Sequence, residues 1–299
     1  MKRNGFISIT VIYSFFLVFL ALMMFIIVNM VTSRNLLNNM KKTIKNDISD
    51  TSFARYLINN YEKKGLVIND DTLDNSALDN SYRFVGSNPS NYVTFNNELY
   101  RVIGVIDGKV KIIKNNPISN MAYDSNNLND YKNSSVYTYL NTIFLLELGE
   151  DNSDLIENSV WYVGGIDSTF KGEIGSNIAK REIGTEKNNG VTITNKIGLP
   201  YIADYIYAGG KEGYGNTVSN LNNWFYTSNM WFITRMSDNL INSYYLKDGG
   251  TIDYEEKNAS EGNKGTVNSL KNIKPTFYLR GNVRYMSGEG TISDPYVVG

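Results

Sequence analysis

The chain has 299 residues and a formal net charge of −1 at pH 7, so its composition gives no reason to propose nucleic-acid binding. It contains no cysteine, which excludes disulfides, thiol catalysis and cysteine-ligated metals. It contains no histidine either, which removes the commonest general base, the Ser-His-Asp triad and nearly all zinc catalysis. The length accommodates a membrane anchor and one sizeable domain.

An apolar stretch at residues 6–31 is the clearest signal in the chain. It contains no Asp, Glu, Lys or Arg. As a helix, its roughly 26 residues rise about 39 Å, enough to cross a hydrocarbon core of about 30 Å. A buried helix of a globular domain is rarely apolar on every side over such a length. We therefore expect a transmembrane helix over residues 6–31.

The start of the chain resembles a prepilin (class III) signal. A short basic leader, KRNG, precedes an apolar helix that opens with Phe, FISITVIYSFFLVFLALMM. In that family a membrane peptidase cuts after the Gly and methylates the new N-terminal residue. The resemblance implies a leader over residues 1–5, cleavage after Gly5 and methylation of Phe6. Thr10 replaces the family's usual Glu, which neutralises a neighbour's amino terminus in the filament, so a minor pilin-like or merely anchored protein is favoured.

Charge and resemblance give opposite orientations for this helix. Lys2, Arg3 and the amino terminus precede it, and more basic residues follow it, which favours a cytoplasmic C-terminus. The prepilin resemblance implies the reverse. Because long domains translocate largely regardless of charge, we expect a single-pass cell-membrane protein with an extracellular C-terminal domain.

Residues 32–65 are predicted to form a helical stalk. Apolar residues recur there mostly at four-residue steps, at Leu36, Leu37, Met40, Ile44 and Ile48. A second run places Phe53, Leu57 and Tyr61 on one face and ends at Gly65. Residues 50–52 either cap a new helix or lie within one long helix. The apolar stripe serves pilin-like assembly or packs on the chain's own head domain.

Residues 66–81 are rich in Asp, Asn and Ser, which predicts a linker or surface loop. The carboxylates of Asp70, Asp74 and Asp79 suggest calcium. The EF-hand pattern fails, however, because Asn75 stands where Gly is needed and Ser81 where the bidentate Glu is needed. We expect no metal and no other cofactor.

A globular head domain is predicted over residues 82–299. The strand-like runs NYVTF, ELYRVIGVI and KVKIIK are separated by Asn96-Asn97 and Asp107-Gly108. Asp-Gly is a strong hairpin signal because both turn positions favour φ > 0, so we expect a three-stranded meander. The middle strand is apolar on both faces and should be central. Arg101 interrupts one face and should pair with a structural carboxylate.

The later elements alternate between helices and strands. An amphipathic helix capped by Ser134 or Ser135 should end near Gly149. The expected elements that follow are a short strand around Trp161, a strand ending at Leu199, a helix from Pro200 to Gly209, the strand MWFIT, a hairpin over residues 248–250 and the strand PTFYL. The fold class is therefore α+β: a long N-terminal helix, then a mixed, β-rich head with small antiparallel sheets.

A second resemblance covers this head. NYVTFNNELYRVIGVIDGKVKIIKN, IGLPYIADYIYAGG, WFITR, IKPTFYLRGNV and SGEGTISDPYVV, in that order, resemble a domain of uncharacterised Gram-positive surface proteins that is often found behind a prepilin-type N-terminus. That domain is similar to the C-type-lectin-like group, which implies a mixed head with two small sheets and long loops. Tyr100 stands where the family more often has Trp. No catalytic residue is transferred.

We do not expect an enzyme. Glycosidic acid/base chemistry needs two carboxyls at a defined separation, and no spacing in the sequence selects a pair among the acids of the head. The acids considered are Glu173, Glu182, Asp204, Asp238 and Asp253.

The sequence favours a membrane-anchored pilin-like protein, of minor pilin or pseudopilin type, whose head serves assembly, adhesion or ligand binding. Expected partners are the membrane, a prepilin peptidase, other pilin-like subunits and a surface glycan or protein ligand, but no nucleic acid. The alternatives are an unprocessed single-pass protein with a lectin-like domain and a tethered glycan-active enzyme. Tyr226 and Trp231 are the expected ligand-binding residues, with core packing as the alternative for Trp224 and Trp231.

Overall fold

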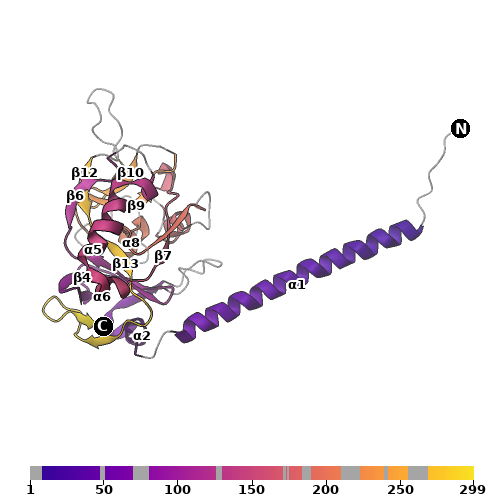
Figure 1. The fold of residues 1–299 in the computed structure, drawn as a ribbon, viewed down its shortest axis with the longest axis horizontal. Coiled ribbons are helices and arrows are strands. Elements are labelled where there is room, and N and C mark those ends of the chain that lie inside the picture. The colour runs from indigo at the N-terminus through magenta and orange to yellow at the C-terminus, as the bar shows by residue number, and fades with distance from the viewer. Residues whose placement is uncertain are drawn as a thin grey trace, which may run out of the picture. The chain divides into compact units, whose positions relative to one another are not determined.

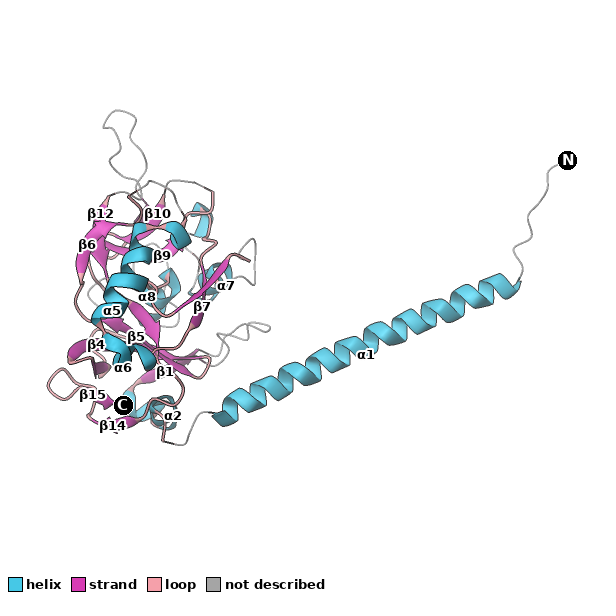
Figure 2. Ribbon diagram, viewed as in Figure 1, coloured by secondary structure: helices cyan, strands magenta, loops and turns pink. Residues whose placement is uncertain are grey.

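The chain folds as two units, residues 1–47 and residues 48–299. The computed structural model describes residues 9–47, 51–69, 81–125, 130–170, 173, 175–183, 190–209, 223–238, 242–254 and 269–299. Figure 1 traces the elements in chain order, and Figure 2 distinguishes helices from strands. The described part of the first unit is a single helix and the second unit is a mixed head, so the fold is α+β, as expected.

The described residues of the first unit form helix α1, Ile9–Asp47. Within it, Tyr13–Thr32 is long and apolar enough to cross a membrane, and none of this span is buried inside the structure. Its large side chains are exposed on all sides, Phe15 to 74% and Met24 to 67%. A helix that is apolar all round and uncovered suits a lipid environment. Gly5 and Phe6 lie outside the described residues, as do the side chains of the expected stripe from Leu36 onward.

The predicted stalk over residues 32–65 is not one helix. Helix α1 ends at Asp47, and a new helix, α2, spans Phe53–Asn59. Ser52 caps α2, since its Oγ accepts a hydrogen bond from the backbone N–H of Arg55 at 3.2 Å. A short helix α3, Tyr61–Lys64, follows and ends at Gly65 with φ 74°. Phe53 and Leu57 are fully buried in the head, so this half of the predicted stalk belongs to the head domain.

The predicted linker over residues 66–81 begins with a strand. Strand β1, Leu66–Asn69, pairs antiparallel with β2, Ser81–Phe84. The head therefore starts well before residue 82. The three aspartates considered for calcium, Asp70, Asp74 and Asp79, lie outside the described residues.

The predicted meander is confirmed as β3, β4 and β5, at Tyr92–Phe95, Glu98–Ile106 and Lys109–Lys114. The turn residues Asn96, Asn97 and Asp107 have φ near 50°, as tight hairpin turns require. Strand β4 pairs with β5 along one edge and with β3 and β2 along the other. Its residues 100–106 are all buried, so it is the central strand.

The two larger sheets are mixed rather than purely antiparallel, and one of them is not small. Among the described strands, eight form one sheet, in which β15 runs parallel to β3. Five others form a second sheet, in which β12 runs parallel to β9. The further strands of the first sheet are β13, Thr276–Tyr278; β14, Tyr285–Ser287; and β15, Tyr296–Val298. The second sheet contains β6, Ser119–Ala122; β9, Met230–Arg235; β10, Ser243–Leu246; β11, Ile252–Tyr254; and β12, Leu270–Ile273.

The expected amphipathic helix is present, with an unexpected π-helical centre. Ser134 caps it, its Oγ accepting from the N–H of Tyr137 at 3.1 Å. The run passes through α4, Ser135–Thr138; the π-helix η2, Tyr139–Phe144; α5, Leu145–Glu147; and, after a turn at Leu148, α6, Gly149–Asp154. Short 3₁₀ turns occur at Tyr131–Asn133 (η1) and Ser168–Phe170 (η3), and α7 spans Gly175–Glu182.

Trp161 lies in strand β7, Ser159–Tyr162, which pairs with β8, Thr192–Asn195. The strand expected to end at Leu199 ends instead at Asn195. Helix α8 spans Ile202–Ala208, so its first helical residue is Ile202 rather than the expected Pro200, and Tyr201 is its N-cap. Strand β9, the hairpin β10–β11 and strand β13 lie where the sequence predicts them.

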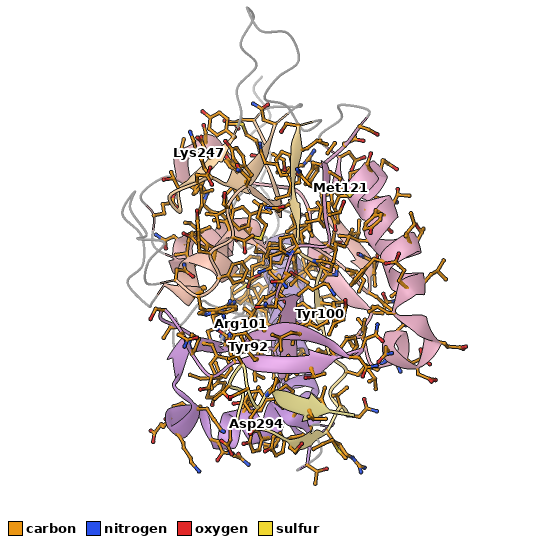
Figure 3. All side chains as sticks on the ribbon, turned by 90° about the vertical axis from the view of Figure 1, so that its left-hand side faces the viewer. Tyr92, Tyr100, Arg101, Met121, Lys247 and Asp294 are labelled. Atoms are coloured by element: carbon orange, nitrogen blue, oxygen red, sulfur yellow. The ribbon has the colours of Figure 1, made fainter. Side chains whose placement is uncertain are left out.

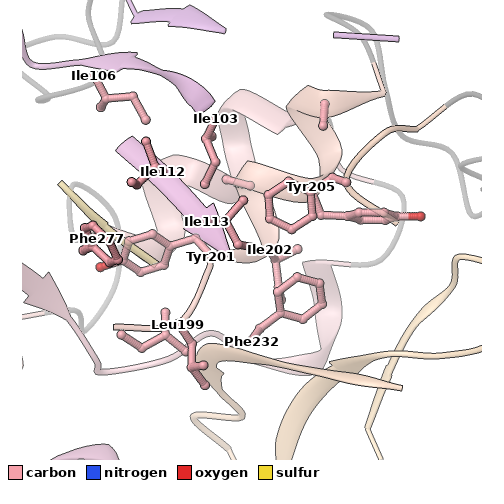
Figure 4. Close-up of a cluster of buried hydrophobic side chains, with 14 of the residues drawn as sticks. Ile103, Ile106, Ile112, Ile113, Leu199, Tyr201, Ile202, Tyr205, Phe232 and Phe277 are labelled. Carbon is pink, nitrogen blue, oxygen red and sulfur yellow. The ribbon is translucent and has the colours of Figure 1, made fainter. Parts of the chain in front are cut away.

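One hydrophobic core fills the head, and α8 lies at its centre. Every described residue of α8 is buried, and the helix contacts β2 of the first sheet and β9 of the second. Figure 4 shows Ile202 and Tyr205 of α8 beside Ile113 of β5 and Phe232 of β9. Helix α8 thus joins the two large sheets.

Candidate ligand-binding cavity

A cavity of about 630 Å³ lies between the start of the β4–β5 hairpin and the π-helical run. Pockets of about 300–1,000 Å³ are typical of small-molecule and cofactor sites. Segments far apart in the chain build its walls, so the cavity depends on the tertiary fold.

One wall comes from the meander. Glu98 and Leu99 of β4 and Lys114 of β5 line it, and the Lys114 ammonium pairs with the Glu98 carboxylate. Lys114 is itself buried, and its Nζ lies 5.1 Å from the centre of the Tyr100 ring. Asn96 in the β3–β4 turn accepts a hydrogen bond from the Asn152 amide of α6 at 3.0 Å. These contacts hold the side chains of this wall in place.

The opposite wall comes from the π-helix and the turn after it. Tyr139 and Phe144 line the cavity from η2, and Glu147 and Leu148 follow them. A π-helical turn takes up an extra residue, and such turns occur often at functional sites. Burial, and then the nearby negative charge of Glu147, raise the pKa of the Tyr139 hydroxyl. The hydroxyl therefore stays protonated and can donate a hydrogen bond.

The cavity offers both hydrogen-bonding groups and ring faces. Glu98, Glu147, Asn96 and Asn116 supply carboxylates and amides, and Tyr139 with other side chains supplies apolar surface. Two carboxylates against one ammonium leave the lining net negative, which disfavours an anionic ligand. Planar polar groups beside an aromatic ring suit a neutral polyhydroxylated ligand. The hydroxyl groups of such a ligand form hydrogen bonds with the polar groups, and its C–H face packs on the ring.

The residues expected to bind ligand lie elsewhere. Trp231 is only 1% exposed, and its indole N–H donates to the Met121 carbonyl at 3.1 Å. Trp224 is also buried and donates to the Phe84 carbonyl at 2.8 Å. Both are core residues, so the expectation for Trp231 is wrong. Tyr226 is half-buried and does not line the cavity; its hydroxyl accepts from the N–H of Gly249 at 3.2 Å.

Among the described residues, Arg101 contacts an amide and aromatic rings rather than the carboxylate that we expected. Its Nε donates to the Asn91 amide oxygen at 2.6 Å, and its guanidinium lies over the rings of Tyr92 and Trp224, 4.0 and 4.7 Å from their centres. Figure 3 shows Arg101 beside Tyr92. Burial lowers the pKa of Arg101 to about 10, which still leaves it charged at neutral pH.

Two of the acids considered for glycosidic chemistry meet at the start of α8. Asp204 accepts from Arg83 at 2.9 Å and from Lys111 at 2.6 Å, and all three side chains are buried. Glu182 is 2% exposed and accepts from the backbone N–H groups of Ile202 and Ala203, each at 2.8 Å. These carboxyls have structural partners, and neither lines the cavity.

The other three acids also have partners at the surface. Glu173 pairs with Arg181, Asp238 accepts from Ser168 at 3.3 Å and Asp253 pairs with Lys247 at 3.2 Å. Within the described ranges, no group of three or more Asp or Glu side chains gathers that could hold a metal ion.

Sequence reasoning missed the cavity residues Glu98, Lys114, Tyr139 and Glu147. The hairpin turn was visible in the sequence, but its proximity to the helical run is a long-range contact. The π-helical insertion also escapes a search for 3.6-residue periodicity, because it shifts the faces within the helix.

Comparisons of the chain with protein-family models, with curated proteins and with solved structures found no match.

Proposed function

We propose that this chain is a membrane-anchored, pilin-like protein whose head is displayed outside the cell and binds a ligand. The observation that supports it most is the uncovered apolar span Tyr13–Thr32 joined to a head that forms its own core. A span of this length with no buried residue is suited to lipid, and the leader before it resembles a prepilin signal.

The cavity between the β4–β5 hairpin and the π-helical run suits a neutral glycan as ligand. The size of the cavity, its amide and carboxylate groups and the rings of Tyr139 and Phe144 support this choice. The alternative, an unprocessed single-pass protein with a lectin-like head, would bind such a ligand too. Cleavage at the N-terminus distinguishes the pilin-like protein from this alternative.

The mature N-terminus tests the pilin-like route. Mass spectrometry of the protein from cells that contain a prepilin peptidase should find a chain that starts at methylated Phe6. Gly5→Val, which places a branched side chain at the cut, should leave the leader attached. A wild-type chain that retains Lys2 and Arg3 refutes the pilin-like route and leaves a plain anchor.

A cysteine-labelling experiment tests the orientation. The chain has no cysteine, so the wild type provides a blank background. Leu146→Cys places one thiol at a side chain that is 80% exposed. A membrane-impermeant maleimide should label this variant on intact cells. Labelling only after lysis would place the head in the cytoplasm and contradict the proposal.

Glycan binding can be tested with matched variants. Glu98→Gln and Tyr139→Ala should each weaken binding to the glycans that the wild type binds on an array, by roughly 10- to 100-fold. The first replaces an acceptor oxygen of the cavity with a donor amide, and the second removes a ring and a hydroxyl. Asp151→Asn, a charge change at an exposed residue outside the cavity lining, is the control. Equal binding by all variants would exclude this cavity as the glycan site.

A further inference from the structure

The cavity between the β4–β5 hairpin and the π-helical run has an apolar floor. Phe144 and Leu148 line the cavity and are buried, so they lie at its depth. Leu99 and Ile118, which are half-buried, continue this apolar surface towards the mouth. A sugar hydroxyl pressed against these four side chains would lose its water without gaining a hydrogen bond. The floor therefore suits an apolar group of the ligand.

The buried charge of the lining already has a partner. Lys114 is buried, and its ammonium pairs with the Glu98 carboxylate and lies 5.1 Å from the centre of the Tyr100 ring. Because the ammonium has a counter-charge, it does not require an anionic group on the ligand.

The mouth of the cavity carries polar groups that match an amide. The side-chain oxygens of Asn96 and Asn116 each accept a hydrogen bond from a neighbouring asparagine, at 3.0 and 3.1 Å. Each of these two side chains keeps its NH₂ group as a donor. Glu98 and Glu147 are exposed and add carboxylate oxygens, which accept hydrogen bonds. An amide of a ligand uses both kinds of group, since its carbonyl oxygen accepts and its N–H donates.

We propose that this cavity selects N-acetylated sugars, with the acetyl methyl on the floor and the amide at the mouth. The inference rests on the proposed glycan binding and names the class of glycan. An acetamido group joins a methyl to an amide, which is the order in which the cavity presents its apolar and polar surfaces. The sugar ring can then pack its C–H face on Tyr139, which also lines the cavity.

Two related sugars fit this arrangement less well. A plain hexose has a hydroxyl in place of the acetamido group, and a free amino sugar has an ammonium. Both would bring a polar group to the apolar floor. The carboxylates of Glu98 and Glu147 attract an ammonium, but they are exposed and solvent screens them, whereas the loss of water at the floor is not screened. We therefore expect the acetamido sugar to bind most tightly.

Saturation-transfer-difference NMR of the full chain in detergent tests the proposal, because it reports which protons of a bound sugar lie against the protein. The probes are the methyl glycosides of N-acetylglucosamine, glucose and glucosamine. The acetyl methyl should receive the strongest saturation, and the N-acetylated sugar should bind roughly 10-fold more tightly than the other two.

Several results would overturn this selection. Stronger saturation of the ring protons than of the acetyl methyl is one, and equal or tighter binding of the glucoside or the glucosaminide is another. Each of these leaves glycan binding itself standing. Failure of all three sugars to bind also overturns the selection, and a blank glycan array would then refute glycan binding as well.

Leu99→Thr is the variant that tests the floor. Threonine suits a strand such as β4, and the change shortens the apolar surface and adds a hydroxyl. It should weaken binding of the N-acetylated sugar by roughly 10-fold and leave binding of the glucoside unchanged. Leu146→Thr makes the same change at a side chain that is 80% exposed and outside the lining, and it should bind as the wild type does. Circular dichroism checks that both variants are folded. Unchanged selectivity in folded Leu99→Thr would refute the role of the floor and with it the proposal.

Discussion

Gly104 shows how a single residue controls strand pairing in the large sheet. It lies in β4 opposite Arg83 of β2, and a Cβ placed on it would lie 2.2 Å from the Tyr82 carbonyl oxygen. Gly104→Ala must therefore push β2 away from β4. We expect it to lower the free energy of unfolding by about 1–3 kcal/mol, measured by urea denaturation with tryptophan fluorescence.

Gly281 provides the control for this prediction. It has space around it, and its φ lies outside the left-handed region. Gly281→Ala should change the free energy of unfolding by no more than about 0.5 kcal/mol. Equal effects of the two substitutions would contradict the proposed contact between β2 and β4.

Glu182 should make stability depend on pH. Burial raises its pKa from 4.5 to about 7, and this outweighs the hydrogen bonds from Thr234, Ala203 and Ile202. Because the folded-state pKa is the higher one, the stabilising contribution is complete below pH 4.5 and is lost as the pH rises towards 7. At about 1.4 kcal/mol per pKa unit, the loss amounts to about 3 kcal/mol at most.

Urea denaturation at pH 5 and pH 7.5 measures this effect, and Glu182→Gln should abolish the contribution that falls within this range. Asp204 has the opposite behaviour, because Lys111 and Arg83 lower its pKa despite burial, so its contribution is lost only as the pH falls through the acidic range. A fall in stability between pH 5 and 7.5 that survives in Glu182→Gln would show that another group is responsible.

At the scale of elements, α8 is tied to the large sheet by the buried charges of Asp204, Arg83 and Lys111. Asp204→Asn leaves two buried cations without an anion. We expect it to destabilise the head by about 3–5 kcal/mol in urea denaturation.

The partly exposed pair of Lys109 and Glu157 provides the comparison. Glu157→Gln should cost about 1 kcal/mol or less, since solvent screens this pair. If both substitutions had the same small effect, the buried charges would not hold α8 to the sheet.

Elements with strong local signals were predictable. The meander followed from its two-residue turns, and the helix at Ser135 followed from its cap and its apolar spacing. Strand β1 was missed because its four residues, Leu66–Asn69, adjoin a polar stretch that is typical of linkers. Its pairing with β2 is the long-range contact that defines it as a strand.

At the scale of the whole molecule, the first and last segments of the head pack together. The rings of Tyr56 in α2 and Tyr285 in β14 are stacked at 3.7 Å, and the Phe53 N–H donates to the Val283 carbonyl at 2.8 Å. Strand β15 then pairs with β3. Every described core residue lies at or after Phe53, so residues 53–64 complete the head.

Two truncations test this boundary. A chain that starts at Ile48 should fold with the unfolding midpoint of the full chain, because it keeps the whole described core. A chain that starts at Tyr82 loses the fully buried Phe53 and Leu57. At about 2–5 kcal/mol per large apolar side chain, this loss should lower the free energy of unfolding by several kcal/mol and leave the chain unfolded or aggregated. Circular dichroism and urea denaturation measure both. Folding of the shorter chain would restore the boundary at residue 82.

The sequence by itself determined the features that arise within a few neighbouring residues. The apolar span needs only uncharged length, the hairpin turns need only residues that tolerate φ > 0, and the caps need only a serine before a helix. The tertiary structure decided the rest: the core positions of Trp224 and Trp231, the parallel pairing of β15 with β3, the buried charges around Asp204 and the ligand-binding cavity. These features depend on side chains that are often a hundred or more residues apart, and their free energies depend on burial and pairing, which local patterns do not specify.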